Sequence, residues 1–83
     1  MKSVAPLGGA LHVMWDNTTM NCDKVELDRK KDAGVYSTVY TLAGVATSQH
    51  DTQAVAPGMY CYKARCVKGA NKSPDSNEKC GTP

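Results

Sequence analysis

Four cysteines are the residues of this 83-residue chain with the clearest chemical potential. Three of them lie in PGMYCYKARCVKGANKSPDSNEKC, residues 57–80, and the set is Cys22, Cys61, Cys66 and Cys80. Cysteine sulfur can bind a metal ion, form a redox pair or be oxidised to a structural disulfide. An even number of cysteines in so short a chain is typical of a disulfide framework in an oxidising compartment. Two disulfides are therefore predicted.

The spacing of the cysteines disfavours a zinc site. Zinc knuckles use C-x2–4-C pairs that close a turn around the ion. Cys61 and Cys66 instead lie five residues apart in an alternating run, so their sulfurs point to opposite faces of a strand. We predict no metal and no thiol redox centre.

Two histidines are the remaining candidates for metal binding or base catalysis. His12 alternates outward on its expected strand, and His50 does the same if Gln49 points inward. No carboxylate or nucleophile stands at a fixed, useful spacing from either ring. We interpret both as exposed polar residues, and the sequence predicts no catalytic residue and no cofactor.

The balance of charges and the lack of a long apolar run each exclude one class of partner. The net charge is +2, from ten Lys/Arg and eight Asp/Glu spread along the chain, whereas a nucleic-acid binder shows a clustered basic face. No apolar run approaches the roughly 18–20 residues of a membrane span. A basic patch for an acidic polysaccharide or a membrane surface remains as an alternative, but Glu26 and Asp28 on the neighbouring strand favour compensating ion pairs. The residues of that possible patch are Arg29, Lys30, Lys31, Lys63, Arg65 and Lys68.

The elements that position these side chains read as strands. Helical periodicity is nearly absent, whereas runs of alternating apolar and polar residues recur between Gly, Pro and Asn/Asp turns. They predict a single domain over residues 1–83, a sandwich of two antiparallel sheets with six or seven strands. The strands are expected at residues 10–15, 24–30, 35–42, 46–50, 59–69 and 75–82. The inward-facing core residues are expected to be Leu11, Val13, Trp15, Val25, Leu27, Tyr60, Tyr62 and Ala64.

The last two strands predict one disulfide through their register. If they form a hairpin about Ala70-Asn71, residues whose numbers sum to about 141 face each other. Cys61 then opposes Cys80, and Lys63 opposes Glu78 as a cross-strand pair of opposite charge. We predict a Cys61–Cys80 disulfide.

The ordered set of segments resembles the fibronectin type III domain, in particular modules of secreted bacterial multidomain proteins. LHVMWDNTTMN is similar to the second strand with its core Trp, and VELDRKK resembles the third strand. VYSTVYTLAGVATSQHDT is similar to the next strand, turn and strand, and PGMYCYKARCVKGANKSPDSN to the tyrosine-corner strand and the long loop after it. The resemblance covers residues 11–83.

Two features depart from the family pattern. The stretch before Trp15 is too short for the usual first strand and turn, so residues 1–9 are expected to be a linker or a short edge strand that turns at Gly8-Gly9. Gln49 stands where the family has a core aromatic residue. Residues 81–83 are expected to begin a linker to a further domain.

The resemblance also implies two contacts. Tyr60 takes the tyrosine-corner position, from which its phenol hydrogen-bonds to backbone upstream of its own strand. Cys66 lies where the loop between the second and third strands closes over the core, so a Cys22–Cys66 disulfide is expected. The spacing of four cysteines by itself leaves all three connectivities open.

The candidate binding residues are few. Tyr36 and Tyr40, four apart on one strand, are expected to share a face, which could contact a sugar ring or a protein, although the core needs at least one of them inside. Family members most often bind through the loops at one end, here 16–24 and 68–76, which includes Asn71 and Lys72.

The expected function is that of a non-catalytic secreted or cell-surface module, monomeric in isolation. It would act as a spacer or an adhesion domain with an unidentified protein or glycan partner. The alternatives are an accessory module of a polysaccharide-degrading enzyme, and a structural subunit of an extracellular assembly that binds a neighbour's strand at an open sheet edge.

Overall fold

A computed structural model describes residues 1–16, 22–72 and 76–83. Within these ranges the chain forms strands and no helix, and hence no helix that could cross a membrane. The strands are β1 Ser3–Leu7, β2 Ala10–Met14, β3 Lys24–Lys31, β4 Ser37–Ala43, β5 Ser48–Asp51, β6 Tyr60–Lys68, β7 Asn71–Lys72 and β8 Lys79–Gly81.

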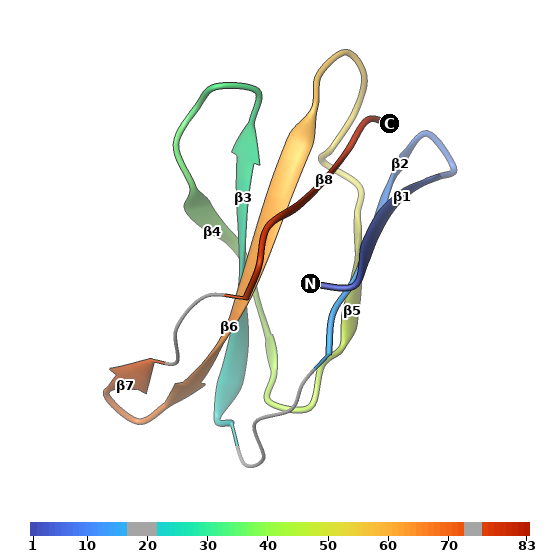
Figure 1. Cartoon of the computed structure of the whole chain (residues 1–83). Helices are drawn as coiled ribbons and strands as arrows, with labels where there is room; N and C mark the ends of the chain where they lie inside the picture. The colour runs from blue at the N-terminus through green and yellow to red at the C-terminus, as the bar shows by residue number, and fades with distance from the viewer. Residues whose placement is uncertain (17–21, 73–75) are drawn as a thin grey trace.

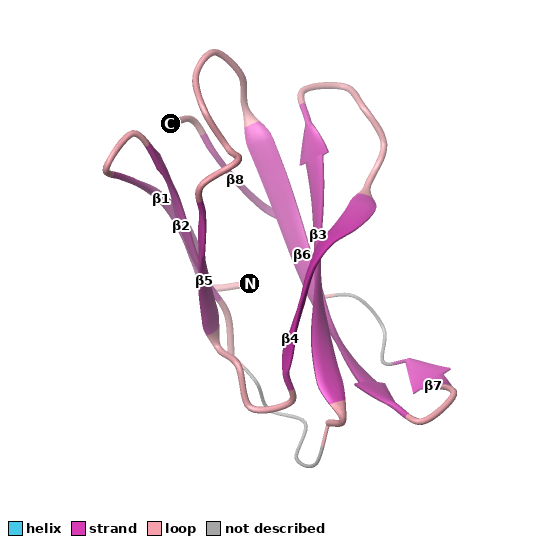
Figure 2. Ribbon diagram, turned by 180° about the vertical axis from the view of Figure 1, so that it is seen from behind, coloured by secondary structure: helices cyan, strands magenta, loops and turns pink. Residues whose placement is uncertain are grey.

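The strands form two antiparallel sheets that face each other, so the all-β, two-sheet prediction is confirmed (Figures 1 and 2). One sheet has the order β1-β2-β5. The other has the order β4-β3-β6, and both β7 and β8 pair with β6 at different positions along it. The core lies between the sheets. Turns β1–β2, β3–β4 and β5–β6 lie at one end of the molecule, the upper end in Figure 1.

The first strand is short and lies at a sheet edge, which is one of the two alternatives expected for residues 1–9. β1 pairs with β2 from Ser3↔Met14 to Leu7↔Ala10. The connecting Gly8 and Gly9 have φ values of 61° and 79°, and two consecutive positive φ values are what a two-residue hairpin turn of this twist requires.

The core is formed by the alternate side chains of each strand that point between the sheets. All eight residues expected inside are buried, and Leu11, Val13, Leu27 and Tyr62 have no exposed surface. Ala54, from the β5–β6 connection, completes the cluster, and Val4, Tyr40 and Leu42 pack against it from the edge strands.

A β-bulge at Val39 changes the parity of β4. Leu27 pairs with Tyr40, but the next residue of β3, Asp28, pairs with Thr38, so Val39 is an extra residue. Tyr40 therefore points inward with Leu27, whereas Thr38 follows Asp28 to the outer face, and Tyr36, two residues before Thr38, lies on that outer face as well. The prediction that Tyr36 and Tyr40 share a face is wrong, because it assumed an unbroken strand.

The C-terminal segment pairs with β6 in two registers. β7 pairs through Val67↔Lys72 after a turn at Gly69-Ala70, one residue earlier than expected. β8 pairs through Cys61↔Cys80, which is the register expected from the sequence. Residues 73–75, between β7 and β8, and residues 17–21, within the expected binding loop 16–24, lie outside the described residues.

Candidate functional site

The four cysteines form two disulfides. Cys61–Cys80 joins neighbouring strands β6 and β8, with Cα atoms 4.0 Å apart. Cys22–Cys66 joins the segment just before β3 to β6, with Cα atoms 5.5 Å apart. These are the two pairings expected from the hairpin register and from the resemblance, and all four cysteines are used.

Cys61, Glu78 and Cys80 are the one group of three potential metal ligands that converge within the described part of the chain. Both sulfurs belong to the same disulfide, so neither is a thiolate. The Glu78 carboxylate instead accepts a hydrogen bond from the Tyr36 hydroxyl and lies 3.6 Å from Lys30 Nζ. These three residues therefore form a disulfide and polar contacts between strands, and they do not present a set of free metal ligands.

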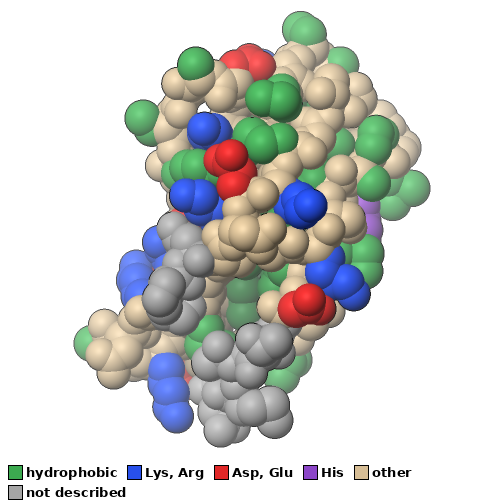
Figure 3. Space-filling view, viewed as in Figure 1, with side chains coloured by type: hydrophobic (Ala, Val, Ile, Leu, Met, Phe, Trp, Pro, Cys, Tyr) green, Lys and Arg blue, Asp and Glu red, His purple; other side chains and the backbone are tan. Residues whose placement is uncertain are grey.

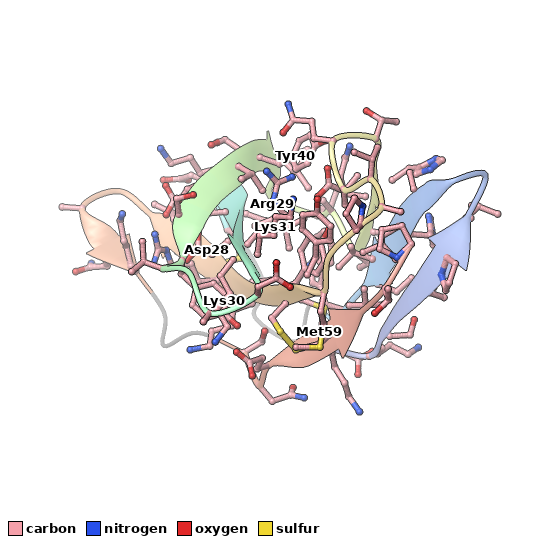
Figure 4. All side chains as sticks on the ribbon, turned by 90° about the horizontal axis from the view of Figure 1, so that it is seen from above. Asp28, Arg29, Lys30, Lys31, Tyr40 and Met59 are labelled. Carbon is pink, nitrogen blue, oxygen red and sulfur yellow. A yellow bond between two sulfur atoms is a disulfide. The ribbon has the colours of Figure 1, made fainter. Side chains whose placement is uncertain are left out.

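A buried carboxylate, Asp51, lies between the two sheets at the end of β5. Its Oδ2 accepts hydrogen bonds from Tyr62 Oη at 2.7 Å and Arg29 Nη1 at 2.8 Å, and its Oδ1 from Tyr40 Oη at 3.1 Å and Gln53 N at 3.0 Å. Figure 4 looks down on this end and shows Arg29 and Tyr40 directed into the space between the sheets. We call Asp51, Arg29, Tyr40 and Tyr62 the inter-sheet network.

The donors keep Asp51 ionised despite its complete burial. Burial by itself raises the pKa of this carboxyl, but the hydrogen bonds from Tyr62 and Arg29 and the Arg29 charge outweigh it and leave the pKa below its usual value. Burial, reinforced by the neighbouring Asp51 charge, raises the pKa of Tyr62 far above its usual value. At neutral pH Asp51 is therefore a hydrogen-bond acceptor whose lone pairs are occupied, rather than an available acid or base.

A second network covers the outer face of the five-stranded sheet. The Arg65 guanidinium lies 2.7 Å from Glu26 and 3.2 Å from Asp28, and both carboxylates are buried beneath it. Asp28 also accepts a hydrogen bond from Thr38, and Lys72 lies 3.3 Å from Glu26. The expected compensating pairs are thus present, and Figure 3 shows the two signs of charge interspersed on the face that it displays.

Tyr36 lies on this same outer face. Lys30 Nζ is 5.4 Å and Lys63 Nζ 4.6 Å from its ring centroid, and its hydroxyl donates to Glu78. Lys63 was expected to pair with Glu78, and the two share Tyr36 as a common neighbour. With its ring beside two ammonium groups, Tyr36 is not a bare platform for a sugar ring.

The remaining candidate residues are dispersed. Asn71 and Lys72 are exposed on β7, and Lys72 is engaged by Glu26. His12 and His50, although expected only to point outward, are direct cross-strand partners with ring centroids 6.2 Å apart.

Sequence reasoning missed the inter-sheet network. Arg29 lies on the same face of β3 as Val25 and Leu27, so the alternation of the strand already placed it inward. The expectation from the sequence instead assigned it to a basic surface run. Asp51 likewise shares the inward parity of Gln49. A buried cation on one strand requires a buried anion nearby, and this signal would have led to Asp51.

Searches against protein-family models, curated proteins and solved structures found no match to this chain.

Proposed function

We propose that this chain is a non-catalytic, extracellular β-sandwich module of the fibronectin type III kind, which serves as a spacer or a protein-interaction domain in a larger secreted or cell-surface protein. The observation that carries the proposal is the pair of disulfides, because such bonds persist in oxidising compartments and stabilise small domains with thin cores.

Two features of the fold support the family assignment. The Tyr60 hydroxyl donates a hydrogen bond of 2.9 Å to the carbonyl of Val55, five residues upstream, as a tyrosine corner does. The sheets β1-β2-β5 and β4-β3-β6-β8 follow the order in which an immunoglobulin-like sandwich distributes its strands.

The carboxylates support a non-catalytic role. Catalytic acids and bases need pKa values near the working pH and a path to substrate. Asp51 and Glu26 instead have lowered pKa values, because Tyr62 and Arg29 donate to the first and Arg65 to the second. Both act as fixed acceptors that hold strands together.

Among partners, a protein fits better than a glycan. A glycan-binding face needs flat aromatic rings, but Tyr40 points into the sandwich and two lysines neighbour the Tyr36 ring. The upper end carries apolar side chains that are exposed to solvent, among them Val35, Val55 and Met59, of the kind that protein interfaces cover.

The compartment is tested by producing the chain with and without export to an oxidising environment. The exported protein should contain no thiol that reacts after denaturation, and it should resist proteolysis. The same chain kept reduced should be degraded at a much higher rate. Equal protease resistance in both forms would remove the basis for the extracellular assignment.

The role is tested by replacing this segment, in the longer protein that the proposal implies, with an unrelated sandwich of similar length. A spacer tolerates this exchange, whereas an interaction module loses partner binding. Full activity of the longer protein with a flexible Gly/Ser linker of equal residue number in place of this segment would contradict both roles. Neither a fixed distance nor a binding surface would then be needed.

A further inference from the structure

The two histidines of the chain stand directly opposite each other on the three-stranded sheet. His12 of β2 pairs with His50 of β5, and side chains of directly paired residues leave the sheet on the same face. That face is the outer one, because the neighbours Val13 and Leu11 on β2 point into the core. Figure 3 shows histidine surface at the margin of the molecule, on the side of this sheet.

The separation of the two rings fits a shared metal ion. Their centroids are 6.2 Å apart. With metal–nitrogen bonds of about 2.0–2.1 Å, two imidazoles on one ion have centroids about 5–6.5 Å apart, the value increasing with the angle at the metal. The observed spacing lies toward the wide end of this range, so a small rotation about the side-chain bonds adjusts it to a tetrahedral angle.

The two nitrogens of the His12 ring differ in access to the surface. Nδ1 is buried and has no hydrogen-bond partner among the described residues. An ion on the outer face would therefore bind this ring through Nε2, and the exposed His50 would supply the second nitrogen.

The residues around the two histidines carry no positive charge that would repel an ion. The residues paired with these positions and their neighbours on the same face are small or uncharged: Ala5 stands beside His12, and Ser48 stands opposite Met14. No Lys or Arg is paired in register with either histidine. Water is available for the remaining positions around the ion.

We propose that His12 and His50 form a surface site for a divalent first-row transition cation such as Zn²⁺ or Ni²⁺, which ties β2 to the edge strand β5. Imidazole is a preferred ligand of these ions, whereas Ca²⁺ and Mg²⁺ prefer oxygen ligands. The site does not depend on the proposed function, and it involves none of the cysteines, which are all in disulfides.

The test is a calorimetric titration of the oxidised protein with Zn²⁺, and separately with Ni²⁺. The expected result is one ion per chain, with affinity at least about tenfold lower in His50→Gln. Because the His50 side chain is exposed, this variant should fold like the wild type. Met14→Leu, on the same strand and face, is the matched control and should keep most of the affinity. In parallel, Zn²⁺ should raise the melting temperature of the wild type more than that of His50→Gln.

Three outcomes would overturn the proposal. The first is the absence of binding by the wild type up to about 1 mM Zn²⁺. The second is undiminished binding by both His50→Gln and His12→Gln, which would place the ion elsewhere. The third is equal binding of Ca²⁺, which imidazole ligands do not explain. Shifts of the His12 and His50 ring resonances on addition of Zn²⁺, and of no other aromatic ring, would support it.

Discussion

At the scale of single residues, Asp51 connects the two sheets through its hydrogen bonds. It is fully buried, and the hydrogen bonds that it accepts come from three strands and the β5–β6 connection. A charge held in this way is costly to leave without its partner, because a buried ion has lost its water. Removal of any one member of the inter-sheet network should therefore destabilise the fold.

Asp51→Asn keeps the shape of the side chain but removes the charge that Arg29 and the two tyrosines need. We expect it to lower the free energy of unfolding by on the order of 3 kcal/mol, measured by urea denaturation. Asp16→Asn is the control: its carboxylate is exposed and lies 3.8 Å from Lys2, so a change below about 0.5 kcal/mol is expected. Similar losses in the two variants would show that the network contributes little.

Gly44, in the turn after β4, packs directly on backbone of the segment before β3. A Cβ at this position would overlap the carbonyl oxygen of Cys22 and lie 2.7 Å from its carbonyl carbon. Backbone next to a disulfide cannot move aside cheaply. Gly44→Ala should cost about 2–3 kcal/mol in thermal or urea unfolding.

Gly34→Ala is the comparison for that variant. Its added Cβ would meet only the Lys31 carbonyl oxygen, at 3.0 Å, so a small shift relieves it and the loss should be clearly smaller. Equal stability of Gly44→Ala and the wild type would mean that the turn relaxes without cost.

At the scale of elements, β6 is the strand through which the parts of the larger sheet are joined. It pairs with β3, β7 and β8 and carries Cys61 and Cys66, one from each disulfide. β8 pairs with it over three residues only, so the covalent bond to Cys61 contributes much of what holds β8 in place.

The two disulfides should therefore fail differently. Loss of Cys61–Cys80, in the Cys61→Ala/Cys80→Ala variant, should cost about 3 kcal/mol and expose β8 amides to hydrogen exchange while β3 stays protected. The Cys22–Cys66 disulfide closes a longer loop, so its loss should cost about 4 kcal/mol, with exchange increasing at the start of β3. Retained protection of β8 in the first variant would contradict this division.

Much of the element level was readable from the sequence, since alternation alone placed Leu11, Val13 and Leu27 in the core. The bulge at Val39 was not readable, because nothing in the β-branched run 37–43 marks an extra residue, and one extra residue reverses every side chain beyond it. The pairing of Arg29 with Asp51 joins strands of different sheets. Strand parity gives the inward direction of each, but only the packing of the two sheets brings them together.

At the scale of the whole molecule, stability should depend on pH at both extremes. The pKa values of Asp51 and Glu26 are lowered in the folded state, so their contributions are present above the unfolded values of about 4 and are lost as the pH falls below them. The pKa values of Tyr62 and Tyr40 are raised, so their contributions are present below about pH 10 and are lost as the pH rises above it.

The melting temperature followed by circular dichroism should thus be nearly constant between about pH 5 and 9 and fall on both sides. In Asp51→Asn the acidic decline should be shallower, because one titrating group is gone. An acidic decline of unchanged slope in that variant would mean that other carboxyls account for it.

The order of the disulfides along the chain also limits the end-to-end length that the unfolded chain can reach under tension. Because Cys66 lies between Cys61 and Cys80, the covalent path runs from Cys22 straight to Cys66, back to Cys61 and on to Cys80. Only residues 1–22, 61–66 and 80–83 lie on that path, about 32 of the 83, so an oxidised chain drawn taut by its ends reaches roughly 110 Å, against roughly 280 Å after reduction. Since the folded domain measures 36 Å along its longest axis, the oxidised chain can lengthen only about threefold before its disulfides bear the tension, whereas the reduced chain can lengthen about eightfold.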